Sequence, residues 1–235
     1  MIAQNRNGSF WLVTQVDHAL QCEQLARACL IHAACDDVLL ACRHHDDGWR
    51  PMDAQPRWSS AGLTTFENWP ANERPAIWAS CIDRTAEVSL YAGVIASLHF
   101  TAFIDAESAF ARERATQRVG WLRTLGRSAE EAAHDYALLR AIDWISLLFC
   151  AARPGAKKPP SWLTLRVPYD DAKWSARWVS DDELQVRTDA GDAVFEPTTI
   201  VTPTRRLGGR AIESETKLAA AWRCAPVHPV RFKIR

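Results

Sequence analysis

Hydrophobic positions in the first two thirds of the chain recur at steps of three and four, the spacing of one face of an α-helix. Thr14 is suited to cap the first of these helices, and Asp36 or Asp37 the second. Ser128 forms a capping-box pattern with Glu131 and starts the last one. Together these signals predict helices over residues 14–34, 38–45, 76–85, 87–103, 106–125 and 129–150.

The stretch from Trp49 to Pro75 has no sustained period and is interrupted by prolines and tryptophans. A loop of this length in a compact domain is uncommon and is usually functional. We expect a pocket wall or lid, and the alternative is that its aromatic rings only cover the hydrophobic core. Gly48, just before this stretch, is expected to take the left-handed conformation that ends a helix.

The pattern changes after residue 152, where a stretch rich in Pro, Gly and Lys reads as a linker. Alternating, strand-like runs follow, and residues 189–192 between two of them form a candidate hairpin turn. We place strands at residues 163–167, 184–188, 193–195 and 230–234, and a short helix at 213–223. The sequence therefore predicts a mainly α fold: a helical bundle at residues 1–152 carrying a small β-rich appendage at residues 153–235.

Charge and cysteine content narrow the classes of partner. The chain has 28 basic and 28 acidic residues, a balance that argues against nucleic acid or an anionic membrane surface as the partner. The most apolar segment, residues 141–152, is about half the length of a membrane span of roughly 20 residues. Seven cysteines without a Cys-x-x-Cys pair indicate reduced thiols. No signal-peptide pattern is present near the N-terminus, so we expect a cytoplasmic protein.

The stretch His44–Trp49 concentrates residue types that bind metals and transfer protons. Three other polar residues fall on apolar helix faces. His18 is in register with Cys22 and Leu25, and His99 lies one turn after Ile95. Asp143 lies on an apolar face of the last helix, where an unpaired carboxylate would be costly.

These inward positions come from separate helices, which a bundle can bring to one internal point. In chain order they are His18, His45, Asp46, His99 and Asp143. Imidazoles combined with carboxylates suit a divalent transition metal such as Mn, Fe, Zn or Ni, and suit Mg less well because Mg prefers oxygen ligands.

This order resembles the signature of the HD-domain superfamily of metal-dependent phosphohydrolases and phosphodiesterases: a His, a vicinal His-Asp, and a distant Asp. His18, His45, Asp46 and Asp143 match it one by one. The resemblance implies that these four residues bind a metal that activates water against a small phosphorylated substrate. A phosphomonoester or phosphodiester, nucleotides included, would be the substrate.

The resemblance also implies roles for two neighbours. His99 would be a ligand of a second metal or the acid that protonates the leaving oxygen, and Asp47 would orient the water or a ligand histidine. The chain departs from the pattern at Trp49, where many superfamily members with cyclic-dinucleotide phosphodiesterase activity have Lys. Dinuclear members usually need two extra histidines, and only His99 faces inward here. Both departures favour one ion. A bacterial family of unknown function that contains the stretch His-Asp-Asp-Gly-Trp is similar over nearly the full length.

Two other functions are compatible with the same residues. Some HD-type proteins bind a pair of irons and cleave substrates with oxygen. Alternatively, the domain is catalytically inactive and binds a ligand or partner through its tryptophan-rich segment. The basic C-terminal part could also contribute Arg205, Arg206 or Arg210 to substrate binding.

Overall fold

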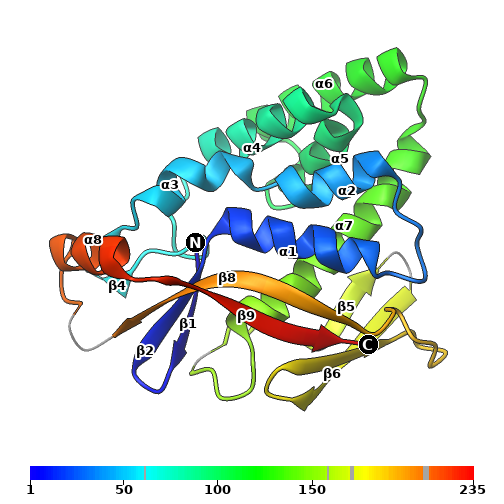
Figure 1. Cartoon of the computed structure of the whole chain (residues 1–235). Coiled ribbons are helices and arrows are strands. Elements are labelled where there is room, and N and C mark those ends of the chain that lie inside the picture. Colours follow the sequence, from blue (N-terminus) through cyan, green and yellow to red (C-terminus); the bar gives the residue numbers. More distant parts are fainter. Residues whose placement is uncertain (61, 158, 170–171, 209–211) are drawn as a thin grey trace.

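The computed structural model describes residues 1–60, 62–157, 159–169, 172–208 and 212–235. About 47% of the chain is helical and 24% is in strands, and helices cover one face of a curved seven-stranded sheet (Figure 1). The chain is therefore an α+β fold, and the prediction of a mainly α bundle with a small β appendage is wrong. The helices are α1 (Gln15–Arg27), α2 (Asp36–His44), η1 (Asp47–Trp49), α3 (Arg50–Ala54), α4 (Arg74–Val88), α5 (Leu90–Thr101), α6 (Ala109–Leu125), α7 (Ala129–Ala151) and α8 (Glu215–Cys224).

The sheet joins the two ends of the chain. Its strand order is β1-β2-β8-β9-β7-β6-β5, and all neighbours are antiparallel except β7 and β9. The strands are β1 (Ile2–Arg6), β2 (Ser9–Val13), β5 (Arg166–Tyr169), β6 (Ala172–Ser180), β7 (Glu183–Arg187), β8 (Thr198–Gly208) and β9 (Val227–Ile234), and a separate ribbon pairs β3 (Trp58–Ser59) with β4 (Gly62–Leu63). The apolar run at residues 10–13 is thus an interior strand, because β2 lies between β1 and β8.

One continuous hydrophobic core lies between the helices and the sheet. Leu25 and Ile142 from the helices belong to the same buried cluster as Trp174 and Phe232 from the strands. Helix α1 is also held to β8 by its Gln24 side chain, which accepts from the Val201 amide at 2.9 Å and donates to the Val201 carbonyl at 2.9 Å. A division of the chain after residue 152 stays a prediction.

Most predicted helices are present with shifted ends. Thr14 caps α1 by accepting from the Asp17 amide, and Ser128 and Glu131 form the capping box of α7. Helix α1 ends at Arg27 rather than near residue 34, because the following chain forms a bridge at Cys29 with the segment around Phe195. Residues 193–195 accordingly make only isolated bridges instead of the expected strand.

Strands β1, β6 and β8 of the large sheet and both strands of the β3–β4 ribbon were not predicted, and β8 shows why. Its inward positions are Ile200, Thr202 and Thr204, all buried, so that polar side chains interrupt the hydrophobic alternation. Strand β1 likewise turns the polar Gln4 inward, whereas β6 alternates inward Trp174, Ala176 and Trp178 with exposed polar residues, a pattern that the sequence analysis did not use. The predicted turn at residues 189–192 is confirmed, since the Thr188 amide donates to the Asp192 carbonyl at 3.0 Å.

Glycine is required at position 48 for a different structural reason from the one expected. It lies in η1 and is not among the glycines with a positive φ. A Cβ atom on Gly48 would lie 2.5 Å from the Cys81 backbone nitrogen and 2.7 Å from the Ile77 carbonyl oxygen of α4. Glycine is needed here because α4 closely approaches the turn that follows α2 and contains His45 and Asp46, called the His-Asp turn below.

Candidate metal centre

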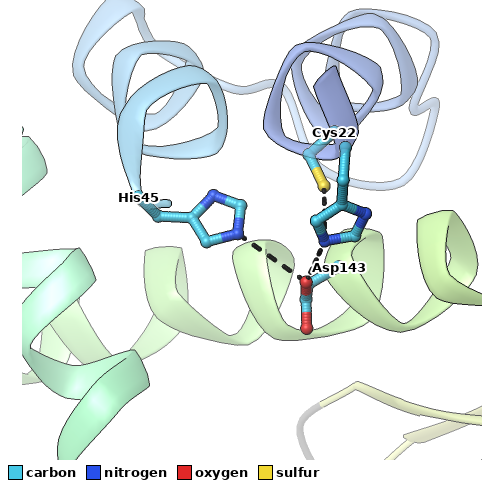
Figure 2. A group of neighbouring side chains, drawn as sticks. Cys22, His45 and Asp143 are labelled. Atoms are coloured by element: carbon cyan, nitrogen blue, oxygen red, sulfur yellow. Dashed lines mark hydrogen bonds and ion pairs between the residues drawn. The ribbon is translucent and has the colours of Figure 1, made fainter. Parts of the chain in front are cut away.

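Helices α1, α2 and α7 converge on a group of four buried or largely buried side chains: His18, Cys22, His45 and Asp143. Each offers one ligand atom, and these atoms all lie within 4.8 Å of one another. Figure 2 shows Cys22 and His45, from α1 and the end of α2, directed at Asp143 on α7. Three of the four predicted metal ligands thus meet at one point.

His18 is held at both ring nitrogens. Its Nε2 lies 2.7 Å from Asp143 Oδ1, and its Nδ1 lies 2.6 Å from Ser146 Oγ. The Ser146 hydroxyl also lies 2.8 Å from Gln21 Oε1, an acceptor to which it can donate its hydrogen. In that arrangement Nδ1 of His18 donates to Ser146, and Nε2 is directed at the centre of the group.

His45 is fully buried and oriented by its own helix. Its Nδ1 lies 3.0 Å from the Cys42 carbonyl oxygen and donates to it. The other nitrogen, Nε2, lies 3.5 Å from Asp46 Oδ2 and 3.7 Å from Asp143 Oδ1, without a hydrogen-bond partner among the described residues. A buried imidazole nitrogen without a hydrogen bond that faces two carboxylates is the arrangement of a histidine metal ligand.

The electrostatics of the group favour a cation. Burial opposes protonation of His45, but the charges of Asp46 and Asp143 outweigh it and raise its pKa to about 9. Burial likewise opposes ionisation of Asp143, yet the neighbouring imidazoles of His18 and His45 hold its pKa well below the usual range. Burial raises the pKa of Asp46. The two carboxylates therefore stabilise positive charge at His45, which a divalent ion would also supply.

Asp46 and Cys22 are both buried but differ in whether they line the cavity. Asp46 lines a cavity together with His18 and Asp143, whereas Cys22 is fully buried and is not among the lining residues. Cys22 Sγ lies 3.9 Å from His18 Nε2. Sequence analysis placed Cys22 only on the same helix face, although its position four residues after His18 is the spacing of two ligands on one helix.

His99 and Asp47 differ in their relation to the group. His99 lines the same cavity, its ring centroid lies 5.4 Å from that of His45, and its Nδ1 is buried without a partner among the described residues. Burial lowers the pKa of His99 to about 4, so its imidazole stays neutral and can bind a metal ion or accept a hydrogen bond, but it is a weak base. Asp47 is turned away, with its carboxylate 2.8 Å from both His44 Nδ1 and the Arg50 guanidinium.

The cavity above the group has a volume of about 610 Å³, within the usual range for small-molecule sites. Trp49 and Phe66 line it, so part of the irregular segment 49–75 forms the expected pocket wall. Trp69 from the same segment packs with Trp49 in a buried core cluster, so the segment also covers part of the hydrophobic core.

The C-terminal arginines lie elsewhere. Arg205 stacks on Trp222 and lines a second cavity of about 330 Å³, and Arg206 lies over the Trp11 ring. Arg210 lies outside the described residues.

The fold and the site define an α+β protein with a buried His-Cys-Asp group, able to hold a metal ion, at the floor of a cavity. The chain belongs to the family described as "Protein of unknown function (DUF3891)", whose model matches residues 1–190. No curated protein and no solved structure matches the chain. Across the described ranges, no helix is both long and apolar enough to span a membrane.

Proposed function

We propose that the protein is a metal-dependent hydrolase of phosphate esters, with one divalent ion bound by His18, His45, Asp46 and Asp143. The observation that carries this proposal is the buried, unpartnered Nε2 of His45, which faces two carboxylates at the floor of a cavity. The order of these residues along the chain also resembles the HD-domain signature.

The donor set fits such an ion. Two imidazole nitrogens and two carboxylates suit Mn, Fe, Zn or Ni. The other ring nitrogen, Nδ1, is held by the Ser146 hydroxyl in His18 and by the Cys42 carbonyl in His45. If Cys22 replaces Asp46 as a ligand, its soft thiolate shifts the preference towards zinc.

When bound, the ion supplies a Lewis acid for a phosphoryl oxygen and lowers the pKa of water. The chain's own residues orient and confine the reactants. Ser146 and the Cys42 carbonyl fix the two imidazoles, and neutral His99 at the cavity wall can accept a hydrogen bond from the attacking water and orient it. Water adds to phosphorus, the ester P–O bond breaks, and the leaving oxygen takes up a proton to give an alcohol and phosphate.

A second candidate keeps the site but changes the reaction. His99 faces the same cavity as His18 and Asp143 and has a free nitrogen within the described part of the chain, which favours a second metal close by. Two irons at this position would support oxygen-dependent cleavage. Two iron atoms per chain after anaerobic loading, with a di-iron absorption or Mössbauer spectrum, would favour this function over hydrolysis.

The test combines metal content with turnover. The native protein is measured by elemental analysis and assayed with p-nitrophenyl phosphate and bis-p-nitrophenyl phosphate in Mn, Fe, Zn and Ni. We expect about one ion per chain and ester hydrolysis, with both lost in His45→Gln and in Asp143→Asn and kept in His228→Gln, whose site is an exposed strand position. Unchanged metal content in folded His45→Gln would refute the site, and bound metal without turnover of any ester would indicate a binding domain.

A further inference from the structure

The walls of the cavity are mainly aromatic. Trp78, Phe100 and Phe103 form one set of neighbouring rings with centroids 6.1 to 6.2 Å from the Trp78 ring. Trp162 forms a second set with Trp144 at 5.6 Å and Phe66 at 6.4 Å. Aromatic rings do not ligate a metal ion, but they offer a surface on which an apolar group of a ligand can pack.

Two of these rings are exposed to an unusual degree. Phe103 is 58% exposed and Trp162 is 42% exposed, although both border the cavity. Exposed apolar side chains that cluster at a concave site mark a ligand-binding or interaction surface. A ligand seated in the cavity would cover them.

The charged side chains of the cavity differ in whether they have hydrogen-bond partners within the protein. Glu67 accepts from the Trp162 indole at 2.9 Å, and Arg74 donates to the backbone carbonyls of Glu67 and Trp69. Arg140 differs from both. Within the described residues its guanidinium has no carboxylate partner, and its Nε is buried without a hydrogen bond.

Arg140 is also placed beside the metal centre. Tyr136, Arg140, Asp143 and Leu147 all line the cavity and follow one another on α7 at steps of four, three and four, so they share one helix face. The guanidinium lies over the Tyr136 ring at 5.9 Å. A cation one turn from Asp143 can bind oxygens of a group that contacts the ion.

The charge balance limits how much anion the cavity accepts. A divalent ion is neutralised by Asp46 and Asp143, and Glu67 balances Arg74. Arg140 then remains as a single uncompensated positive charge. This suits one phosphoryl group and not a polyphosphate chain.

We infer that the cavity binds an ester with a single phosphoryl group and an apolar, aromatic organic part, and that Arg140 binds its non-bridging oxygens. This inference rests on the proposed function. Arg140 acts as a specificity-determining residue, because a guanidinium binds two phosphoryl oxygens at once. The aromatic walls bind the organic part and disfavour sugars, whose hydroxyl groups would lose hydrogen bonds to water there.

The test measures binding directly, on the metal-loaded full chain, by calorimetry. The ligands are naphthylmethylphosphonate, methylphosphonate and uncharged naphthalenemethanol, none of which has a phosphate ester, and AMP as the nucleotide for comparison. We expect naphthylmethylphosphonate to bind at least tenfold more tightly than methylphosphonate or AMP. In Arg140→Gln its affinity should fall by about tenfold to a hundredfold, as for a lost hydrogen bond to a charged group.

Matched variants separate recognition from folding. Naphthalenemethanol binding should change by less than about twofold in Arg140→Gln, because that ligand has no anion to lose. Arg123→Gln, at an exposed position of α6, should bind all four ligands as the unmodified chain does, and Arg140→Lys should keep part of the phosphonate affinity. Phe103→Ala should reduce the preference for the naphthyl group.

The outcomes distinguish the two proposals. Equal binding of naphthylmethylphosphonate and methylphosphonate, tighter binding of AMP, or unchanged binding in Arg140→Gln would overturn the inference. Faster hydrolysis of AMP than of naphthyl phosphate would also overturn it while leaving the proposed function intact. The expected binding pattern without hydrolysis of any ester would retain the inference and refute the proposed function.

Discussion

Replacing Gly48 by Ala tests whether the close approach of the His-Asp turn to α4 holds the metal centre in place. The added Cβ would lie 2.5 Å from the Cys81 nitrogen and 2.7 Å from both Cys81 Sγ and the Ile77 carbonyl oxygen. Normal contacts of this kind exceed about 3.4 Å, so the turn or α4 must move by almost 1 Å. Overpacking of this size costs about 1–3 kcal/mol, partly offset by about 0.4–1 kcal/mol from the less flexible unfolded chain.

We therefore expect Gly48→Ala to destabilise the protein by about 1–2 kcal/mol in urea unfolding and to weaken metal binding at least about tenfold, because His45 and Asp46 move with the turn. Gly120→Ala is the matched control. Gly120 lies within α6 with open space around its Cα, so alanine there should stabilise the protein by about 0.5–1 kcal/mol.

A second variant sharpens this test. Two of the three atoms that the new Cβ approaches belong to the backbone, so Cys81→Ala should rescue Gly48→Ala only in part. Stability within about 0.5 kcal/mol of the unmodified protein, together with normal metal affinity, would refute the packing argument for Gly48.

Three further predictions concern the metal centre. Ser146→Ala should lower metal affinity about tenfold to a hundredfold in competition with a chromophoric chelator, since Ser146 orients His18, whereas Ser97→Ala, also buried but on α5 away from the group, should not. If Cys22 is a ligand, the cobalt-substituted protein will show a thiolate charge-transfer band near about 300–350 nm that disappears in Cys22→Ser and persists in Cys42→Ser; absence of the band would leave Asp46 as the fourth ligand. The pKa of His45 is raised from 6.5 to about 9, so in the metal-free protein its contribution is complete below pH 6.5 and is lost as the pH rises through 9. Between pH 6.5 and 9 the free energy of unfolding should fall by up to about 3 kcal/mol, seen as a lower urea midpoint. A pH-independent midpoint, or the same fall in His45→Gln, would contradict this assignment.

The meeting of His18, His45 and Asp143 was more accessible to sequence reasoning than the fold around them. His18 and Asp143 could be placed inward because each continues an apolar helix face, and that register survives whatever the helices pack against. The same reasoning could not single out Arg140, since an arginine on a helix face is ordinary and only the packed structure shows that, among the described residues, its Nε is buried at the cavity without a hydrogen bond.

The sheet was underestimated for a physical reason. Strand β8 turns Thr202 and Thr204 inward, and their β-branched side chains fit a buried strand although they break the hydrophobic alternation. Its partner β2 is too distant in sequence for any local pattern to suggest the pairing. Gly48 was expected to adopt a left-handed conformation at a helix end. The backbone of α4, which is the actual reason for the glycine, lies about 30 residues further along the chain and could not be seen in the local pattern.

The pairing of β2 with β8 has a consequence for how the chain can fold during synthesis. Helix α1, which carries His18, follows β2 directly and is held through Gln24 by Val201 of β8. At about 5–20 residues per second, the ribosome delivers that partner roughly 10–40 s after β2 has emerged. Until then β2 has an open edge and the first histidine of the site rests on a helix without its support. Assembly of the metal centre is thereby delayed until nearly the whole chain has been made, and the exposed edge makes this interval the one in which aggregation competes with folding.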